Sequence, residues 1–321
     1  MNVPVFDLHC DTVLGLMGRD MSTVGSLRAN SQHIDLERGK TLAGYAQCFA
    51  IFTTTAFKLP NNIKPEDIFW RAVSVLQDAI DKNSDVIRQA RSAQDVLRNH
   101  AEGKMSAIFT VEGPAGIGFD PAKLEKLYNL GFRISSLGWN ENNCLTGSHV
   151  TGGGLTKRGR EYVRECQRLG ILVDVSHISD EGFWDIMEIT QAPVIATHSN
   201  SRAVYGASRN LTDDMFRAIC QTGGVAGYNL CAEFTGENPT LDTVCDHIFH
   251  FLELDPSGEH IALGGDLDGI DHMPAGFTGV QDYPKLAERL MERGLDENTL
   301  RNIFWNNAIG VMDRALCVNQ K

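Results

Sequence analysis

Short hydrophobic runs alternate along the chain with longer stretches in which apolar residues recur every three or four positions. The short runs are rich in Val, Ile and Phe, which is typical of buried strands, and the longer stretches are typical of amphipathic helices. Eight runs are predicted to be strands: Val3–Leu8, Tyr45–Phe52, Met105–Val111, Phe132–Leu137, Ile171–Val175, Val194–Thr197, Val225–Asn229 and Ile261–Gly265. The helices predicted between them include Pro65–Asp81, Ala122–Leu130, Lys157–Leu169, Asp213–Gln221 and Leu241–Leu252.

This alternation of strands and helices predicts a parallel sheet built from repeated βα units. Eight strands favour a closed TIM-type (β/α)8 barrel over an open doubly wound sheet, and no GxGxxG motif follows the first strand. The segments Met17–Thr41 and Thr53–Lys64 exceed ordinary loops, so we expect them to be insertions that cover one barrel face. Residues Tyr283–Ala315 are predicted to form two or three helices that close the barrel. The sequence therefore predicts a single barrel domain over residues 1–321.

The composition is that of a folded globular protein, with 42% hydrophobic and 22% charged residues. A formal net charge of −12 disfavours nucleic-acid and anionic membrane partners. No apolar run approaches the length of a membrane span, and the first residues lack the pattern of a signal peptide, so we expect a cytoplasmic protein. The eight cysteines form no CxxC pair, which favours buried thiols over disulfides or thiolate metal sites.

Polar side chains follow five of the eight predicted strands, where a barrel of this kind carries its catalytic groups. They are His9 and Asp11 after the first strand, Glu112 after the third, His177 after the fifth, His198 after the sixth and Asp266 after the eighth. Because side chains alternate along a strand, His9 and Asp11 are expected to point to the same side. The joint appearance of these residues at strand ends is much more specific than any one of them.

Imidazoles and carboxylates are ligands that zinc accepts, and one carboxylate can bridge two ions about 3.5–4 Å apart. We assign His9, Asp11 and Glu112 to one ion and Glu112, His177 and His198 to the other, with a shared hydroxide between them. Two divalent ions would balance the charge of the three carboxylates and the hydroxide. Without metal, carboxylates that converge in a partly buried mouth cost free energy or become protonated. We therefore expect a binuclear zinc site, with other divalent metals left open.

The remaining histidines are not predicted to be metal ligands. Six are expected to be surface or packing residues: His33, His100, His247, His250, His260 and His272. His149 lies in the polar, glycine-rich loop Thr146–Gly154, where either exposure or reach into the barrel mouth is consistent with the sequence.

The motifs DLHCDT, VEGP, RLGILVDVSHISD, APVIATHSNSRAVYGASRN and GGDLDG occur in this order over nearly the whole chain. This series resembles the renal (membrane) dipeptidase family, which belongs to the amidohydrolase-type metal-dependent barrels. The resemblance implies binuclear zinc held by the same five ligands. It also implies that Arg209 binds the terminal carboxylate of the substrate and that Asp266 is the acid/base that handles the proton. Asp268, two residues further on, is expected to be a structural carboxylate.

One position departs from the family pattern. Dipeptidases of the mammalian type carry a histidine after the fourth strand that contacts the substrate, whereas this sequence has Trp139 in SSLGWNEN. An indole donates one hydrogen bond and cannot become cationic. Asn140, Asn142 and His149 are candidates for the missing donor. Trp139 and Asn140 are assigned to substrate binding.

The function expected from these features is hydrolysis of small dipeptides by metal-hydroxide attack on the amide, with tolerance of a D-residue on the C-terminal side as the resemblance suggests. One alternative is a binuclear hydrolase of another small amide, such as a β-lactam-like or cyclic compound. Another is a non-catalytic metal or peptide binder, against which the intact Asp266 argues. A small dipeptide is the expected partner, and a homodimer is left open.

Overall fold

The computed structural model describes residues 3–18, 21–56 and 63–317, and these contain all eight of the predicted strands. The strands are β1 (Val5–Cys10), β2 (Tyr45–Phe52), β3 (Ile87–Gln89), β4 (Met105–Glu112), β5 (Phe132–Ser136), β6 (Leu172–Asp174), β7 (Val194–Ile195), β8 (Ala226–Tyr228) and β9 (Ile261–Leu263). The short strand β3 was not predicted, and it pairs only with the beginning of β4. The other eight match the predicted runs, most of them trimmed by one or two residues.

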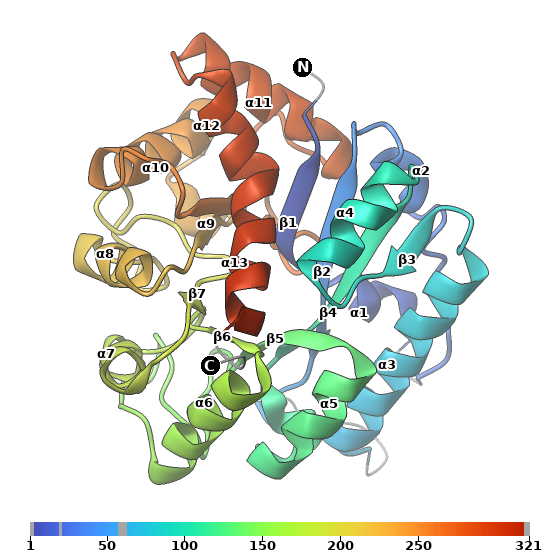
Figure 1. Cartoon of the computed structure of the whole chain (residues 1–321), viewed down its shortest axis with the longest axis vertical. Helices are drawn as coiled ribbons and strands as arrows, with labels where there is room; N and C mark the ends of the chain where they lie inside the picture. The colour runs from blue at the N-terminus through green and yellow to red at the C-terminus, as the bar shows by residue number, and fades with distance from the viewer. Residues whose placement is uncertain (1–2, 19–20, 57–62, 318–321) are drawn as a thin grey trace.

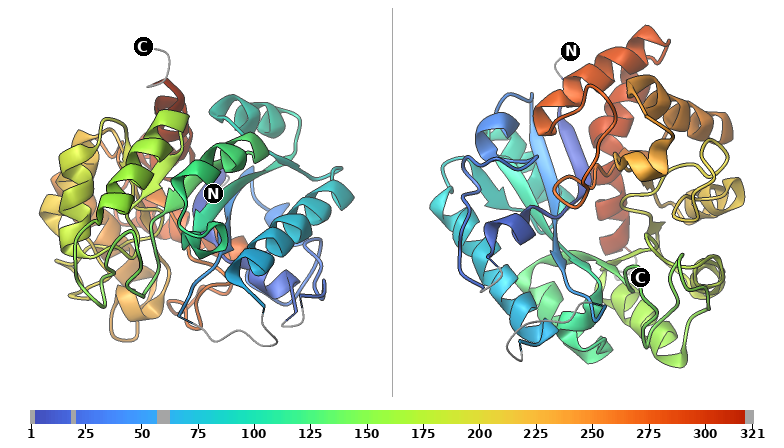
Figure 2. Two further views of the ribbon diagram at one scale, coloured as in Figure 1. Left: turned by 90° about the horizontal axis from the view of Figure 1, so that it is seen from below. Right: turned by 180° about the vertical axis from the view of Figure 1, so that it is seen from behind.

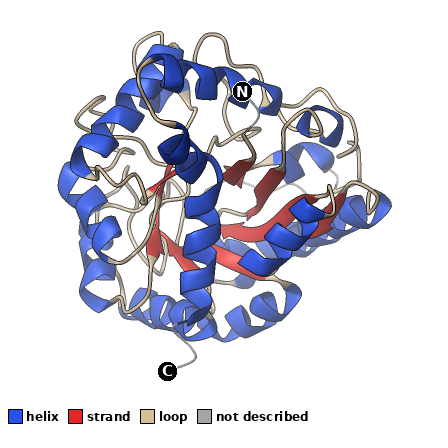
Figure 3. Ribbon diagram, turned by 45° about the horizontal axis from the view of Figure 1, so that its top comes forward, coloured by secondary structure: helices blue, strands red, loops and turns tan. Residues whose placement is uncertain are grey.

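These eight strands form a parallel barrel (Figures 1 and 3). The order of neighbouring strands is β7-β6-β5-β4-β2-β1-β9-β8. A parallel bridge between Ala196 and Ala226 joins the two ends of this order, just beyond β7 and at the start of β8. The predicted (β/α)8 barrel is therefore confirmed.

Most of the helices surround the barrel on its outside, whereas α13 (Asn307–Cys317) runs across one end of it (Figure 1). The helices are α1 (Thr12–Leu16), α2 (Leu36–Gly39), α3 (Pro65–Lys82), α4 (Ala93–Ala101), α5 (Leu124–Leu130), α6 (Lys157–Leu169), α7 (Asp180–Ile189), α8 (Asp213–Gln221), α9 (Ala232–Thr235), α10 (Leu241–Leu254), α11 (Tyr283–Glu292), α12 (Glu297–Arg301) and α13 (Asn307–Cys317). Helix α6 has the predicted bounds because its ends are marked: Thr156 accepts a hydrogen bond from the Gly159 amide, and Gly170 ends the helix in the left-handed conformation.

The barrel interior is filled by one set of side chains along the strands. Phe6, Cys48, Ile108, Ile134 and Leu172 belong to this inner cluster, whereas their strand neighbours pack outward in a second, larger cluster with the helices. The inner cluster also includes Trp305, Ala308, Val311 and Met312 from the end of the chain.

Helix α13 closes the N-terminal end of the barrel. Its apolar side chains pack on the inner cluster, and Trp305, in the π-helical turn Asn302–Asn306 before it, contacts Phe6 with ring centroids 6.0 Å apart. Figure 2 (left) shows α13 and the C-terminus at one end of the molecule and long connecting loops at the other. The prediction that the tail closes the barrel is confirmed, and the opposite end is left for a functional site.

The two predicted insertions are only partly described. Residues 17–41 contain the short helix α2, and residues 57–62 of the second insertion lie outside the described residues. No helix among the described residues is long and apolar enough to span a membrane. The seven cysteines whose side chains are described are unpaired, and most are buried, but Cys144 is exposed and Cys220 half-buried because both lie in or beside surface helices and loops rather than in the core.

Candidate metal centre

The end of β1 contains an irregularity that directs His9 into the barrel mouth. Asp7 pairs with Gln47, but Cys10 pairs with Phe49, so β1 carries one extra residue between these pairs. Val5 and Cys10 consequently both pack on the outer cluster, although simple alternation would place them on opposite faces. The bulge lets His9 follow the inward-facing Leu8 and still point inward.

The predicted ligands and Asp266 come together in one buried cluster at the C-terminal ends of the strands. Glu112, the last residue of β4, lies between the histidines. Its Oε2 is 3.4 Å from His9 Nε2, and its Oε1 is 3.0 Å from His177 Nε2 and 3.9 Å from His198 Nε2. On the other side, His9 Nε2 is 3.5 Å from Asp11 Oδ2 and 3.8 Å from Asp266 Oδ1. Asp11 therefore lies on the same side as His9, as predicted.

The hydrogen bonds of His177 fix its tautomer. Its Nδ1 lies 2.8 Å from Oδ1 of Asn140, an atom that can only accept, so Nδ1 carries the proton and donates. Burial holds the pKa of His177 well below its ordinary value, and the imidazole is neutral. Its Nε2 consequently presents a lone pair.

The same reasoning applies to His198. Thr197 donates its hydroxyl proton to Asp174 Oδ2 at 2.7 Å, so the hydroxyl oxygen accepts from His198 Nδ1, 2.7 Å away. Burial lowers the pKa of His198 as well. Two neutral Nε2 lone pairs, those of His177 and His198, thus face each other across 2.9 Å. Such an arrangement is repulsive unless a cation lies against both nitrogens.

The acidic residues of the cluster are equally in need of a cation. Burial raises the pKa of Glu112 to about 7, and the nearby charge of Asp11 adds to this shift. Burial opposes the charged form of His9, but Glu112 and Asp11 outweigh it and raise the pKa of His9 well above its usual value. Two buried atoms, His9 Nε2 and Asp11 Oδ1, have no hydrogen-bond partner among the described residues. Imidazole and carboxylate atoms spaced 3–4 Å apart fit ligands around ions at about 2 Å.

The donor atoms also gather in groups other than the two predicted ones. Two sets of three in this centre have donor atoms within 4.8 Å of one another: His9, Glu112 and His198, and His9, Asp11 and Asp266. The Asp266 carboxylate therefore lies close enough to His9 and Asp11 to share an ion with them, whereas the prediction placed Asp266 outside the ligand set. His177 completes the centre through its contacts with Glu112 and His198.

Three of the six non-glycine residues with positive φ among the described residues lie in or beside this centre. His177, Asp266 and Asp268 have φ values of 70°, 57° and 69°, in the left-handed region that side chains other than glycine rarely adopt. Asp266 is held further by Asn229, whose Nδ2 donates to Oδ2 at 3.0 Å. Burial raises the pKa of Asp266 to about 6. Asp268, expected to be structural, accepts from the Thr12 hydroxyl at 2.6 Å and from the His33 amide.

Arg209 is buried beside the centre. Its Nη1 donates to Ser199 Oγ at 2.6 Å and its Nη2 to the His198 carbonyl at 2.9 Å. Its Nε is buried and has no partner among the described residues. A guanidinium with an unused donor, fixed next to a ligand histidine, is suited to a carboxylate.

Trp139 and Asn140, which are predicted to bind substrate, also make contacts within the protein. The Trp139 ring packs edge-on against Phe52 at 5.2 Å and lies 6.3 Å from the His177 ring. Asn140 Oδ1 bonds to His177 Nδ1 and also to His149 Nε2 at 2.9 Å, which commits that oxygen to positioning histidines. Asn142 is exposed.

Several supporting residues were missed in the sequence analysis. Asn229 orients Asp266, and Thr197, itself held by Asp174, orients His198. All three lie at or just after the end of a strand. Their position after strand ends could have indicated a role at the site. His149 reaches inward toward Asn140, which answers the question left open by its loop; burial lowers its pKa to about 4.

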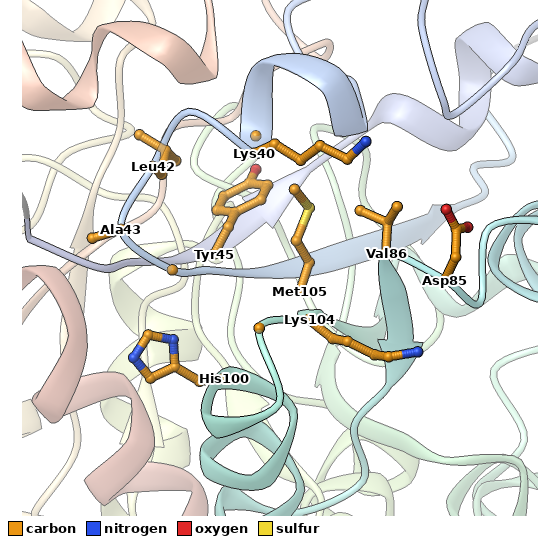
Figure 4. Close-up of a pocket in the computed structure, with 12 residues that line it drawn as sticks. Lys40, Leu42, Ala43, Tyr45, Asp85, Val86, His100, Lys104 and Met105 are labelled. Atoms are coloured by element: carbon orange, nitrogen blue, oxygen red, sulfur yellow. The ribbon is translucent and has the colours of Figure 1, made fainter.

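A separate cavity of about 270 Å³ lies at the opposite end of the strands (Figure 4). Its lining includes Tyr45 and Met105, the first residues of β2 and β4, together with Lys40, His100 and Lys104. None of the ligand clusters found among the described residues involves this lining. The predicted ligands therefore lie away from this cavity, and the remaining candidate group among the described residues is the half-buried set Cys220, Asp255 and His260.

Curated relatives resemble the chain over most of its length. An uncharacterised dipeptidase of Schizosaccharomyces pombe is 38% identical over 68% of this chain, which spans 54% of that protein. The dipeptidase verJ of Clonostachys rogersoniana is 29% identical over 100% of this chain and 86% of its own.

Solved structures agree in fold. A metallopeptidase from Rhodobacter sphaeroides, bound to a phosphinate mimic of the dipeptide L-Ala-D-Ala, is 28% identical with a TM-score of 0.86, covering 98% of this chain and 100% of that one. A structure described as the dipeptidase AC is 30% identical with a TM-score of 0.87, covering 98% and 99%. The model of one family, membrane dipeptidase (peptidase family M19), matches residues 1–321. The chain therefore belongs to the membrane dipeptidase family of metallopeptidases.

Proposed function

We propose that this chain hydrolyses small dipeptides with two zinc ions held at the C-terminal rim of the barrel. The observation that carries the proposal is the pair of neutral lone pairs on His177 and His198, 2.9 Å apart and turned toward the Glu112 carboxylate. A binding surface without metal has no reason to hold these groups together. The buried guanidinium beside them supplies a place for a peptide carboxylate.

In this proposal His9, Asp11 and Glu112 hold one ion, and Glu112, His177 and His198 hold the other. When bound, divalent ions of this kind polarise a carbonyl and lower the pKa of a water molecule. The contacts of Asn140 with His177 and of Thr197 with His198 keep both Nε2 atoms available as ligands.

Asp266 is proposed to handle the proton. Asn229 occupies its Oδ2, which leaves Oδ1 directed toward His9. A carboxyl group whose pKa is raised to about 6 accepts a proton from the attacking water and gives it to the departing amine near neutral pH. Arg209 binds the C-terminal carboxylate through its unused Nε, which orients the amide over the centre.

The substrate class rests on relatives. The Rhodobacter enzyme binds a mimic of L-Ala-D-Ala, and we propose that this chain likewise accepts a D-residue on the C-terminal side. A panel of L,L- and L,D-dipeptides, assayed beside cyclic amides and a β-lactam on zinc-loaded protein, tests the function. Faster hydrolysis of dipeptides supports it. Turnover of the cyclic amides alone, or binding of dipeptides without turnover, would refute it.

A further inference from the structure

Glu141 has a carboxylate oxygen that the fold leaves unused. Its Oε1 accepts from the Thr54 hydroxyl at 2.6 Å and from the Thr55 amide at 3.3 Å. Its Oε2 is buried and has no hydrogen-bond partner among the described residues. A buried, unpartnered carboxylate oxygen is costly, and in a native protein it calls for an explanation.

The position of Glu141 places it at the mouth of the proposed active site. It follows β5 by a short loop, one residue after Asn140, which contacts the ligand His177. Its partner Thr54 lies two residues after Phe52, and Phe52 pairs in register with Glu112. Glu141 therefore joins the loops after β5 and β2 above the strand that carries Glu112.

Two strands separate Glu141 from Arg209 along the rim of the barrel. Arg209 is held by Ser199 and His198, just after β7, whereas the Oε1 contacts of Glu141 are with the loop after β2. In the strand order, β5 and β6 lie between β4 and β7, and the His149 ring bonds to both Asn140 and Ser208, the neighbours of Glu141 and Arg209. A negative group and a positive group thus lie on the same side of the rim and flank the loop that carries His177.

We infer that Glu141 binds a positively charged nitrogen on the N-terminal residue of the dipeptide, either the α-ammonium group or a basic side chain. This inference rests on the proposed dipeptidase function and adds its selectivity. A zwitterionic peptide would place its carboxylate at Arg209 and its cation at Glu141. Trp139, two residues before Glu141, adds an aromatic ring, which attracts cations, where a histidine would add a charge that repels them.

Three substrates separate the two sources of charge: lysyl-, norleucyl- and hexanoyl-D-alanine. The first step of the series removes the side-chain ammonium and the second removes the α-ammonium, with little other change. For the wild-type enzyme, we expect kcat/KM to fall by at least about tenfold at one of these steps, as for loss of a charge-assisted hydrogen bond. Glu141→Gln, which keeps the shape and one acceptor oxygen, should reduce that fall to about twofold or less.

Two further variants distinguish recognition from structure. Glu237→Gln removes an exposed negative charge from the loop between α9 and α10 and should keep the wild-type ratios of kcat/KM between the three substrates. Thr54→Val removes the hydrogen bond to Glu141 Oε1 but keeps the carboxylate, so it should also keep the wild-type ratios of kcat/KM. If Thr54→Val instead loses the preference for charged substrates as Glu141→Gln does, the role of Glu141 is purely structural. Equal kcat/KM of the wild-type enzyme for the three substrates, or wild-type ratios of kcat/KM in Glu141→Gln, would overturn the inference while the dipeptidase function stands. Failure of the wild-type enzyme on every dipeptide would overturn both.

Discussion

Asn140 Oδ1 lies 2.8 Å from His177 Nδ1 and thereby decides which nitrogen of that ring faces the metal centre. The same oxygen accepts from His149 Nε2, so one side-chain amide orients two histidines. Residues that orient metal ligands in this way typically change metal affinity by about 10–100-fold when they are removed.

Asn140→Ala should therefore weaken zinc binding by about tenfold or more, because the His177 ring loses the contact that fixes its tautomer. The exposed neighbour provides a matched control, since Asn142→Ala removes an amide from the same loop without a contact to the centre. Competition with a chromophoric chelator measures both affinities. Equal affinities in the two variants would show that Asn140 does not position His177.

Arg209→Ala should raise KM for free dipeptides more than for C-terminally amidated ones. A charge-assisted contact with the substrate carboxylate contributes about 1.5–3 kcal/mol, and an amidated substrate does not make it. Arg209→Lys keeps the charge but loses the planar fork, and it should fall between the two. Steady-state kinetics on paired substrates tests this assignment, which an equal loss on both would contradict.

Zinc binding should strengthen as the pH rises from about 5 to about 8. Burial raises the pKa of Glu112 to about 7, and its carboxylate neighbours raise that of His9, so at low pH protons occupy atoms that the metal needs. Above these pKa values the competition disappears and the affinity should level off. Calorimetry in buffers of different ionisation enthalpy should detect proton release below about pH 7, decreasing as the pH rises above the pKa values of Glu112 and His9. Uptake of protons, or no dependence on pH, would contradict the coordination proposed for Glu112.

Asp266→Asn should lower kcat by about 10²–10⁴ with a much smaller change in KM, because the amide cannot accept and return a proton. Metal analysis of the same preparation is essential, since Asp266 Oδ1 lies 3.8 Å from His9 Nε2 and belongs to a possible ligand set. A variant that keeps its zinc and loses its rate supports the acid/base role. Loss of zinc along with the rate would instead make Asp266 a ligand.

The barrel and the location of its site were predictable because both depend on local pattern. Buried strands are hydrophobic runs, and polar residues directly after them, such as Glu112 and His198, must gather at one rim of a parallel barrel. The bulge before Cys10 was not predictable from β1 alone, since it exists only relative to β2. Alternation along the strand correctly predicted that His9 and Asp11 lie on the same side, but it did not predict the bulge that directs His9 inward.

Roles set by long-range contacts were equally out of reach. Asn140 was assigned to substrate binding, and no sequence pattern indicated that its oxygen bonds to His149, nine residues away, and to His177, 37 residues away. No sequence pattern marks Glu141, because the contact of its Oε1 and the burial of its Oε2 both depend on how the loop after β2 folds. Such contacts depend on how loops from different strands meet above the barrel.

The central claim is that two ions in this centre are needed for dipeptide hydrolysis, and a zinc titration of metal-free enzyme tests it most directly. Chelator-treated protein should be inactive, and the rate of dipeptide hydrolysis should rise with added zinc to a plateau at about two ions per chain. Glu112→Gln should bind less zinc at both positions, because one carboxylate contacts ligands of both ions. Full activity in metal-free protein, or a plateau at one ion per chain, would contradict the account.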